Sequence, residues 1–171
     1  IETEDCAVLL RAVMEELDRP PYHFYVGTSY RHCLIWENGE VEELTPPHDV
    51  LGREIGPYLP TDKKLHEMMV KSYEILKNHP INEKRRQEGL NPANCCWFWG
   101  AGTRPSLPSF YEKTGKKGIM ISAVDLLKGI AVGAGMDVAG VEGANGGLDT
   151  NYEGKTQAAL DALVRDGYDF A

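Results

Sequence analysis

The sequence predicts an α/β protein of three layers, with helices packed on a mixed, partly antiparallel sheet. Short apolar runs joined by turns follow the first helical segment, which is typical of antiparallel strands. Later in the chain, apolar strands alternate with amphipathic helices, which favours parallel pairing. The 171 residues, 42% hydrophobic and 26% charged, are enough to bury a core.

The first segment, residues 2–17, reads as an amphipathic helix with Thr3 as N-cap and acids in its first turn. An Asn38-Gly39 pair then lies between apolar runs and predicts a two-residue hairpin. The predicted strands are residues 22–26, 31–37 and 40–44.

Residues 45–60 are rich in proline and predict a loop. Thr61 is the expected cap of a long helix, and Pro80 its expected end. The apolar positions of this helix recur at three- and four-residue steps: Leu65, Met68, Met69, Tyr73 and Leu76.

The second half of the chain alternates between the two element types. The pattern predicts helices at residues 81–90, near Phe110, and at 123–132 and 152–164, with strands at 94–99, 118–122 and 136–141. The last residues, 167–171, resemble the start of a buried strand, and residue 1 is not methionine. We therefore expect both ends to be cuts in a longer protein.

Charge and composition argue against several classes of partner. The net charge is −8, and no basic tract interleaved with aromatics offsets it, so nucleic acid is not expected. No apolar run approaches the roughly 20 residues of a membrane span, and the N-terminus lacks a signal-peptide layout. We therefore expect no membrane partner and a cytoplasmic location. The cysteines have no metal-ligand spacing and are expected to be reduced core residues: Cys6, Cys33, Cys95 and Cys96.

Five side chains at element ends are candidates for binding an anion. Arg31 and His32 follow a predicted turn, Arg104 lies among glycines and prolines, and Lys128 lies one helical turn after Asp125. An arginine fork matches a phosphate or carboxylate bidentately. Each feature has a plainer alternative, since a lone arginine can be a solvated surface residue and Asp125 with Lys128 an ordinary intrahelical pair.

The remaining motifs give weaker evidence of a functional site. The glycines of residues 129–140 follow a helix, so they favour a helix C-cap over a dinucleotide loop. The basic run at 83–86 reads as a solvated helix face, and neither His48 nor His66 has a partner at metal-ligand spacing. No catalytic triad, nucleophile elbow or Walker loop is present, so no catalytic and no metal-binding residue is predicted in this chain.

Four stretches, in this order, resemble the archaeal-type cofactor-independent phosphoglycerate mutases of the alkaline phosphatase superfamily. They are HPINEKRRQEGLNPAN, CWFWGAGTRPSLPSF, GKKGIMISAVDLLKGIAVGAGM and GANGGLDTNYEGKTQAAL. The resemblance implies that residues 1–171 form one substrate-binding domain of a longer enzyme, without its metal-binding, phosphatase-like domain.

The resemblance also implies a chemistry. Enzymes of this family interconvert 3-phosphoglycerate and 2-phosphoglycerate, in glycolysis and gluconeogenesis, through a transiently phosphorylated serine. They use two divalent metal ions (Mn, Mg, Co or Zn), which are expected to be bound outside this chain. Arg31, His32, Arg104, Asp125 and Lys128 are then the expected substrate-binding residues. The alternative is an anion-binding module of a related phosphotransfer enzyme that acts on another small phosphorylated acid.

Overall fold

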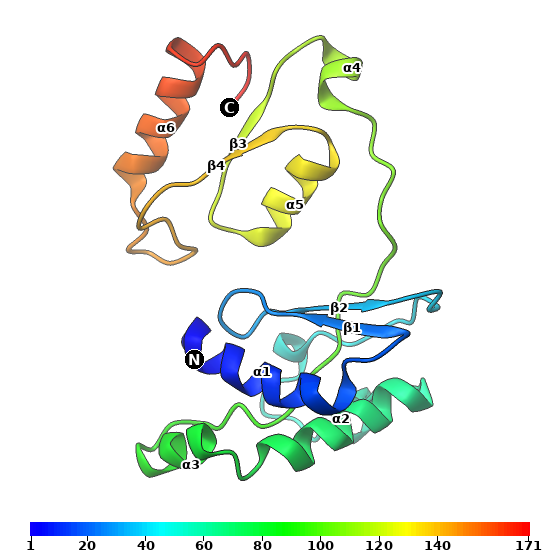
Figure 1. The fold of residues 1–171 in the computed structure, drawn as a ribbon. Coiled ribbons are helices and arrows are strands. Elements are labelled where there is room, and N and C mark those ends of the chain that lie inside the picture. Colours follow the sequence, from blue (N-terminus) through cyan, green and yellow to red (C-terminus); the bar gives the residue numbers. More distant parts are fainter. The chain divides into compact units, whose positions relative to one another are not determined.

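The computed structural model describes all residues, 1–171, and the chain divides into two compact units, Ile1–Thr103 and Arg104–Ala171 (Figure 1). Each unit has its own strand pair, antiparallel in the first and parallel in the second. The α/β class with both kinds of pairing is therefore confirmed, and the pairing is divided between two two-stranded sheets. That residues 1–171 act as one substrate-binding domain stays a prediction.

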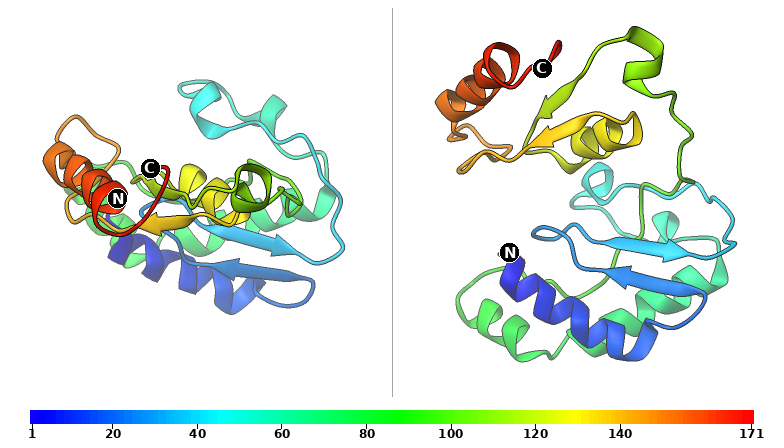
Figure 2. Two further views of the ribbon diagram at one scale, coloured as in Figure 1. Left: turned by 90° about the horizontal axis from the view of Figure 1, so that it is seen from above. Right: turned by 45° about the horizontal axis from the view of Figure 1, so that its top comes forward.

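The first unit is a hairpin with helices on one side of it. β1 (Tyr22–Tyr25) pairs antiparallel with β2 (Cys33–Trp36), and α1 (Thr3–Leu17) lies beside α2 (Lys63–Leu76) on the same side of the hairpin (Figures 1 and 2). The core between them consists of apolar side chains at helical spacing and one strand residue: Leu9, Leu10, Val13, Leu17, Phe24, Leu65, Met68 and Leu76. Burial of these side chains is the main term that stabilises the unit.

The ends of the helices differ from the sequence-based expectation. Thr3 is the first residue of α1 and not its N-cap, and its hydroxyl accepts a hydrogen bond from Ser29. Asp62, not Thr61, caps α2, where its carboxylate accepts from the Leu65 amide at 2.8 Å. The predicted role of Pro80 was also wrong, because α2 ends at Leu76 and Pro80 begins α3 (Pro80–Gln87).

Two predicted strands are absent from the first unit. β2 ends at Trp36, and the Asn38-Gly39 turn leads into residues 40–44, which are not paired. Residues 94–99 are also unpaired, and a side chain takes the place of a sheet neighbour at Cys96. The Ser72 hydroxyl accepts from the Cys96 amide at 2.9 Å. Residues 45–60 form a loop, as predicted, with two 3-10 turns, Pro47–Val50 and Gly56–Tyr58.

The second unit is built on a β-α-β segment. β3 (Ile119–Ile121) and β4 (Asp137–Ala139) pair in parallel through α5 (Asp125–Gly133), while α6 (Tyr152–Val164) lies on the other side of the strands (Figures 1 and 2). α4 (Phe110–Thr114) precedes β3. These five elements confirm the predictions for residues 110–164. Phe170 forms an isolated parallel bridge with Gly118, as the strand-like character of the last residues suggested.

The cysteines only partly fit their expected role. All four are free thiols, but Cys33 and Cys95 are exposed, so the expectation that all four lie in the core was wrong. Cys33 is exposed because it starts a strand of only four residues, of which alternate positions face away from the core. No helix is long and apolar enough to cross a membrane.

Candidate functional site

The turn that carries Arg31 is residues 27–32, which form most of the connection from β1 to β2. Its backbone folds back on itself, since the Arg31 amide donates to the Thr28 carbonyl at 3.0 Å and Ser29 adopts a left-handed conformation (φ 54°). Gly27 is required by close approach, because a Cβ there would lie 2.3 Å from the Arg31 carbonyl oxygen. The guanidinium carbon of Arg31, an exposed residue, lies 5.7 Å from the Tyr30 ring centroid.

The imidazole of His32 is engaged on both sides within this unit. Its Nδ1 accepts a hydrogen bond from the Gly27 amide at 3.1 Å, and its Nε2 lies 3.2 Å from the Cys6 sulfur. Burial lowers the pKa of His32, so the ring favours its neutral form. His32 therefore follows Arg31 in the chain, but its ring accepts a hydrogen bond from the turn and contacts Cys6 of α1.

Arg104 is an exposed residue in a long irregular stretch, residues 91–109, and is the first residue of the second unit. Gly100 in this stretch adopts a left-handed conformation (φ 66°), which a glycine reaches without steric cost. It ends at Ser109, whose hydroxyl caps α4.

Asp125 and Lys128 are both on α5, as the spacing predicted. Asp125 is the first residue of the helix, where a carboxylate is favoured by the helix dipole, and Lys128 is half-buried one turn later. No side chain caps the start of α5. The glycines that follow end the helix, with Gly135 in a left-handed conformation (φ 69°), which confirms the C-cap interpretation of this run.

The candidates are therefore divided between the two units. Arg31 and His32 belong to the first unit, and Arg104, Asp125 and Lys128 belong to the second. That both groups bind one substrate stays a prediction.

The chain contains no cluster of metal ligands, and the Cys96 thiol is not activated. No group of three or more His, Cys, Asp or Glu side chains that could hold a metal is present in residues 1–171. Burial raises the pKa of the Cys96 thiol to about 12, so this cysteine is not a nucleophile at neutral pH. The candidates include two arginines and a lysine, side chains suited to a small anion, and their binding role stays a prediction.

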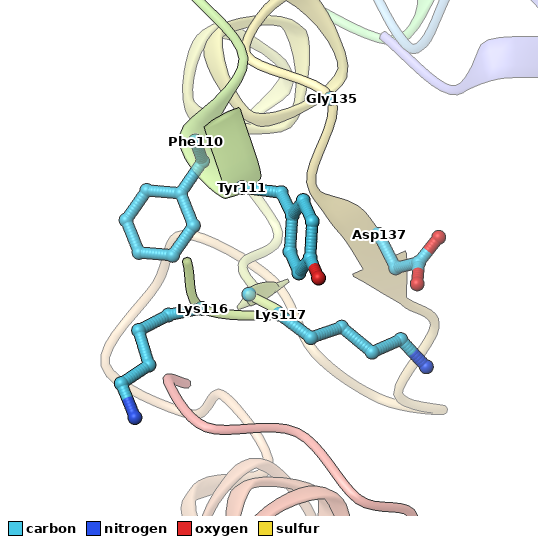
Figure 3. Close-up of a pocket in the computed structure, with 7 residues that line it drawn as sticks. Phe110, Tyr111, Lys116, Lys117, Gly135 and Asp137 are labelled. Atoms are coloured by element: carbon cyan, nitrogen blue, oxygen red, sulfur yellow. The ribbon is translucent and has the colours of Figure 1, made fainter. Parts of the chain in front are cut away.

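A pocket of about 310 Å³ in the second unit was not foreseen from the sequence (Figure 3). Its walls come from α4, the residues just before β3, and the first residue of β4 with a glycine that precedes it: Phe110, Tyr111, Lys116, Lys117, Gly118, Gly135 and Asp137. Lys117 and Asp137 extend to one side of it and Lys116 to another.

The charged groups of this pocket are already engaged by the end of the chain. The Lys116 ammonium lies 3.6 Å from Asp169, Lys117 lies 3.9 Å from the centroid of the Tyr168 ring, and the Tyr168 hydroxyl donates to Asp137 at 2.8 Å. Only the folding of residues 168–170 back onto Lys117 creates this arrangement, so no local sequence signal could have predicted it.

Comparison with known proteins finds relatives that match most of this chain. A family model described as 2,3-bisphosphoglycerate-independent phosphoglycerate mutase matches residues 1–82. A protein of that name from Methanosarcina mazei is 47% identical over 168 residues, which are 95% of this chain and 42% of the relative. A probable phosphoglycerate mutase of the same kind from Geobacter sulfurreducens is 45% identical over 172 residues, or 98% of this chain and 43% of the relative.

Two solved structures also resemble this chain over part of their length. A Pyrococcus horikoshii protein superposes with a TM-score of 0.68 at 29% identity, over 99% of this chain and 41% of that one. The cofactor-independent phosphoglycerate mutase of Thermoplasma acidophilum superposes with a TM-score of 0.54 at 28% identity, over 95% of this chain and 46% of that one. The chain thus spans less than half the length of the relatives it matches.

Proposed function

Because this chain is a domain related to the 2,3-bisphosphoglycerate-independent phosphoglycerate mutases, we propose that it is the substrate-binding part of an enzyme that interconverts 3-phosphoglycerate and 2-phosphoglycerate. The observation that carries the proposal is 47% identity to such a protein over 95% of the chain. On this proposal the enzyme works in glycolysis and gluconeogenesis, in the cytoplasm, and belongs to the alkaline phosphatase superfamily.

The proposal divides the work between this domain and the rest of a longer polypeptide. The relatives are more than twice as long as the part that this chain matches, which leaves room for a second, metal-binding domain. Residues 1–171 do not form a cluster fit to hold a divalent metal, so we assign no ligand of the two metal ions to this chain. The serine that receives the phosphoryl group is likewise assigned to the other domain.

Within this domain the proposed task is to hold and turn the substrate. Phosphoglycerate carries a carboxylate and a phosphate, and after phosphoryl transfer the glycerate must turn its other hydroxyl toward the phosphoserine without escaping. Arg31 can bind one anionic group through two parallel hydrogen bonds. Arg104 and Lys128 supply further positive charge, and Asp125 orients Lys128.

Replacement of Arg31 in the complete polypeptide tests this assignment. We expect Arg31→Ala to lower kcat/KM by a factor that corresponds to roughly 2–4 kcal/mol, because a charge-assisted bidentate contact is lost. Arg31→Lys is expected to recover only part of the loss, since an ammonium cannot form the fork. Arg11, an exposed arginine on α1, is the matched control, and Arg11→Ala should leave kcat/KM unchanged. An Arg31→Ala enzyme with the kinetics of the parent would return Arg31 to the class of surface arginines.

The alternative is an anion-binding module of an enzyme that acts on another phosphorylated acid. The substrate that the complete polypeptide turns over distinguishes the two proposals. The complete polypeptide should interconvert the two phosphoglycerates in the presence of divalent metal, and the 171-residue chain should not. Turnover of a different phosphorylated acid, with none of phosphoglycerate, would favour the alternative.

A further inference from the structure

The start of α1 holds residues 27–32 at several points. The Ser29 amide donates to the Thr3 hydroxyl at 3.0 Å, and the Ser29 hydroxyl donates to the Ile1 carbonyl at 2.8 Å. A third contact joins the Cys6 sulfur to Nε2 of His32 at 3.2 Å. The loop that carries Arg31 is therefore fixed to a helix whose inner face forms part of the core.

The hydrogen bonds of His32 define its protonation. Nδ1 accepts from the Gly27 amide at 3.1 Å, so this nitrogen carries no proton. In the neutral ring the proton is then on Nε2, which donates it to the Cys6 sulfur. Cys6 is only 8% exposed, and burial raises the pKa of its thiol, so the sulfur accepts as a neutral group.

A ring bonded in this way has no nitrogen left for a substrate. A phosphate oxygen on Nε2 would have to displace the Cys6 contact, and on Nδ1 it would meet an acceptor instead of a donor. The hydrogen bonds to His32, Thr3 and Ile1 also hold the backbone of residues 27–32 in an unusual conformation. The left-handed conformation of Ser29 persists only where the surroundings hold it, and Gly27 lies against the Arg31 carbonyl with no room for a side chain.

We propose that His32 and Cys6 are positioning residues, which lock residues 27–32 in one conformation and so present Arg31 to an anionic substrate, while His32 itself does not touch the substrate. The proposal rests on the proposed function and deepens it, because it gives Cys6 a role and changes that of His32. The bond from Gly27 to Nδ1 closes the loop directly, whereas the sulfur of Cys6 is a weak acceptor that fixes the ring.

Two amide replacements separate positioning from substrate contact. The side-chain oxygen of His32→Asn occupies about the place of Nδ1 and can still accept from Gly27, whereas the amide nitrogen of His32→Gln occupies about the place of Nε2. In the complete polypeptide we expect His32→Asn to keep kcat/KM within about threefold and His32→Gln to lose about tenfold. The reverse order, with rescue by His32→Gln, would mean that Nε2 binds the substrate and would overturn the proposal.

Cys6 is tested against the exposed thiol of Cys33. Cys6→Ser keeps an acceptor for the Nε2 proton and should retain most of kcat/KM, Cys6→Ala should lower it, and Cys33→Ala should leave it unchanged. Equal losses for Cys6→Ser and Cys6→Ala, with unaltered His32 ring signals, would refute a role for the sulfur as acceptor.

Spectra of the 171-residue chain test the same bonds without any turnover. The ¹⁵N shifts of His32 should show a protonated Nε2 and an unprotonated Nδ1, and hydrogen exchange of the Gly27 amide should speed up at least tenfold in His32→Gln but not in His32→Asn. A protonated Nδ1, or equal exchange in both variants, would refute the locked loop. If the complete polypeptide has no mutase activity, the proposed function fails, while the positioning bonds are still judged by these spectra.

Discussion

Replacing Asn82 with alanine should cost a large part of the stability of the first unit. Asn82 is fully buried and its side chain makes three hydrogen bonds. Its amide nitrogen donates to the carbonyls of Leu76 and Ala93, both at 2.9 Å, and its oxygen accepts from the Ala93 amide at 2.8 Å. These bonds tie the end of α2 to the unpaired stretch that begins at residue 91.

The magnitude follows from what alanine leaves behind. Each of the three bonds contributes about 1 kcal/mol, and the groups left without a partner add a desolvation cost of about 1–3 kcal/mol each where they stay dry. With some relaxation and entry of water, we expect Asn82→Ala to lower the free energy of unfolding by roughly 3–5 kcal/mol. This is a large fraction of the roughly 5–15 kcal/mol that stabilises a typical domain.

Urea unfolding of the 171-residue chain, followed by tryptophan fluorescence, measures this loss. Asn78 is the matched control, since it is exposed and lies near the same helix end, and Asn78→Ala should change stability by at most about 0.5 kcal/mol. Asn82→Asp is a second test, because a carboxylate oxygen then faces two carbonyls, which raises the pKa of the new side chain. Its stability should therefore increase as pH falls. A loss below about 1 kcal/mol for Asn82→Ala would refute the reasoning.

Three further predictions concern Gly27, Glu42 and the affinity of the chain for 3-phosphoglycerate. Gly27→Ala should weaken phosphoglycerate binding and destabilise the chain by about 1–3 kcal/mol in urea unfolding, since the new Cβ meets the Arg31 carbonyl, whereas Gly56→Ala, with open space, should be neutral. The Glu42 carboxylate accepts from the Thr61 hydroxyl and amide and from the Asp62 amide, and the hydroxyl contributes most to its lowered pKa. Its contribution to stability should be complete above the ordinary pKa of about 4.3 and be lost as pH falls through the lower folded-state value, and Glu42→Gln should lack this dependence in acid unfolding. The 171-residue chain should bind 3-phosphoglycerate no tighter than about millimolar, because exposed arginine contacts are worth about 1 kcal/mol or less each, and micromolar binding in an amide-shift titration would contradict this.

The sequence was sufficient where local pattern and tertiary structure agree. Helical periodicity predicted α2 and α6, and alternation of apolar runs with helices predicted the parallel pair β3–β4. The spacing of Asp125 and Lys128 placed both on α5, and the glycine after this helix was rightly interpreted as its C-cap. These features depend on residues close together in the chain.

Contacts between residues far apart in the chain determined the features that the sequence did not predict. Residues 94–99 have the composition of a strand, but they pair with no neighbouring strand: the Cys96 amide donates to buried Ser72, and buried Asn82 holds the backbone of Ala93 just before them. His32 follows an arginine in a turn and was expected to bind an anion, yet its Nε2 contacts the sulfur of Cys6, 26 residues away in the chain. A sequence pattern shows which groups need partners, whereas only the folded chain determines which partner each one receives, because most buried polar groups are satisfied by whatever the tertiary structure brings near them.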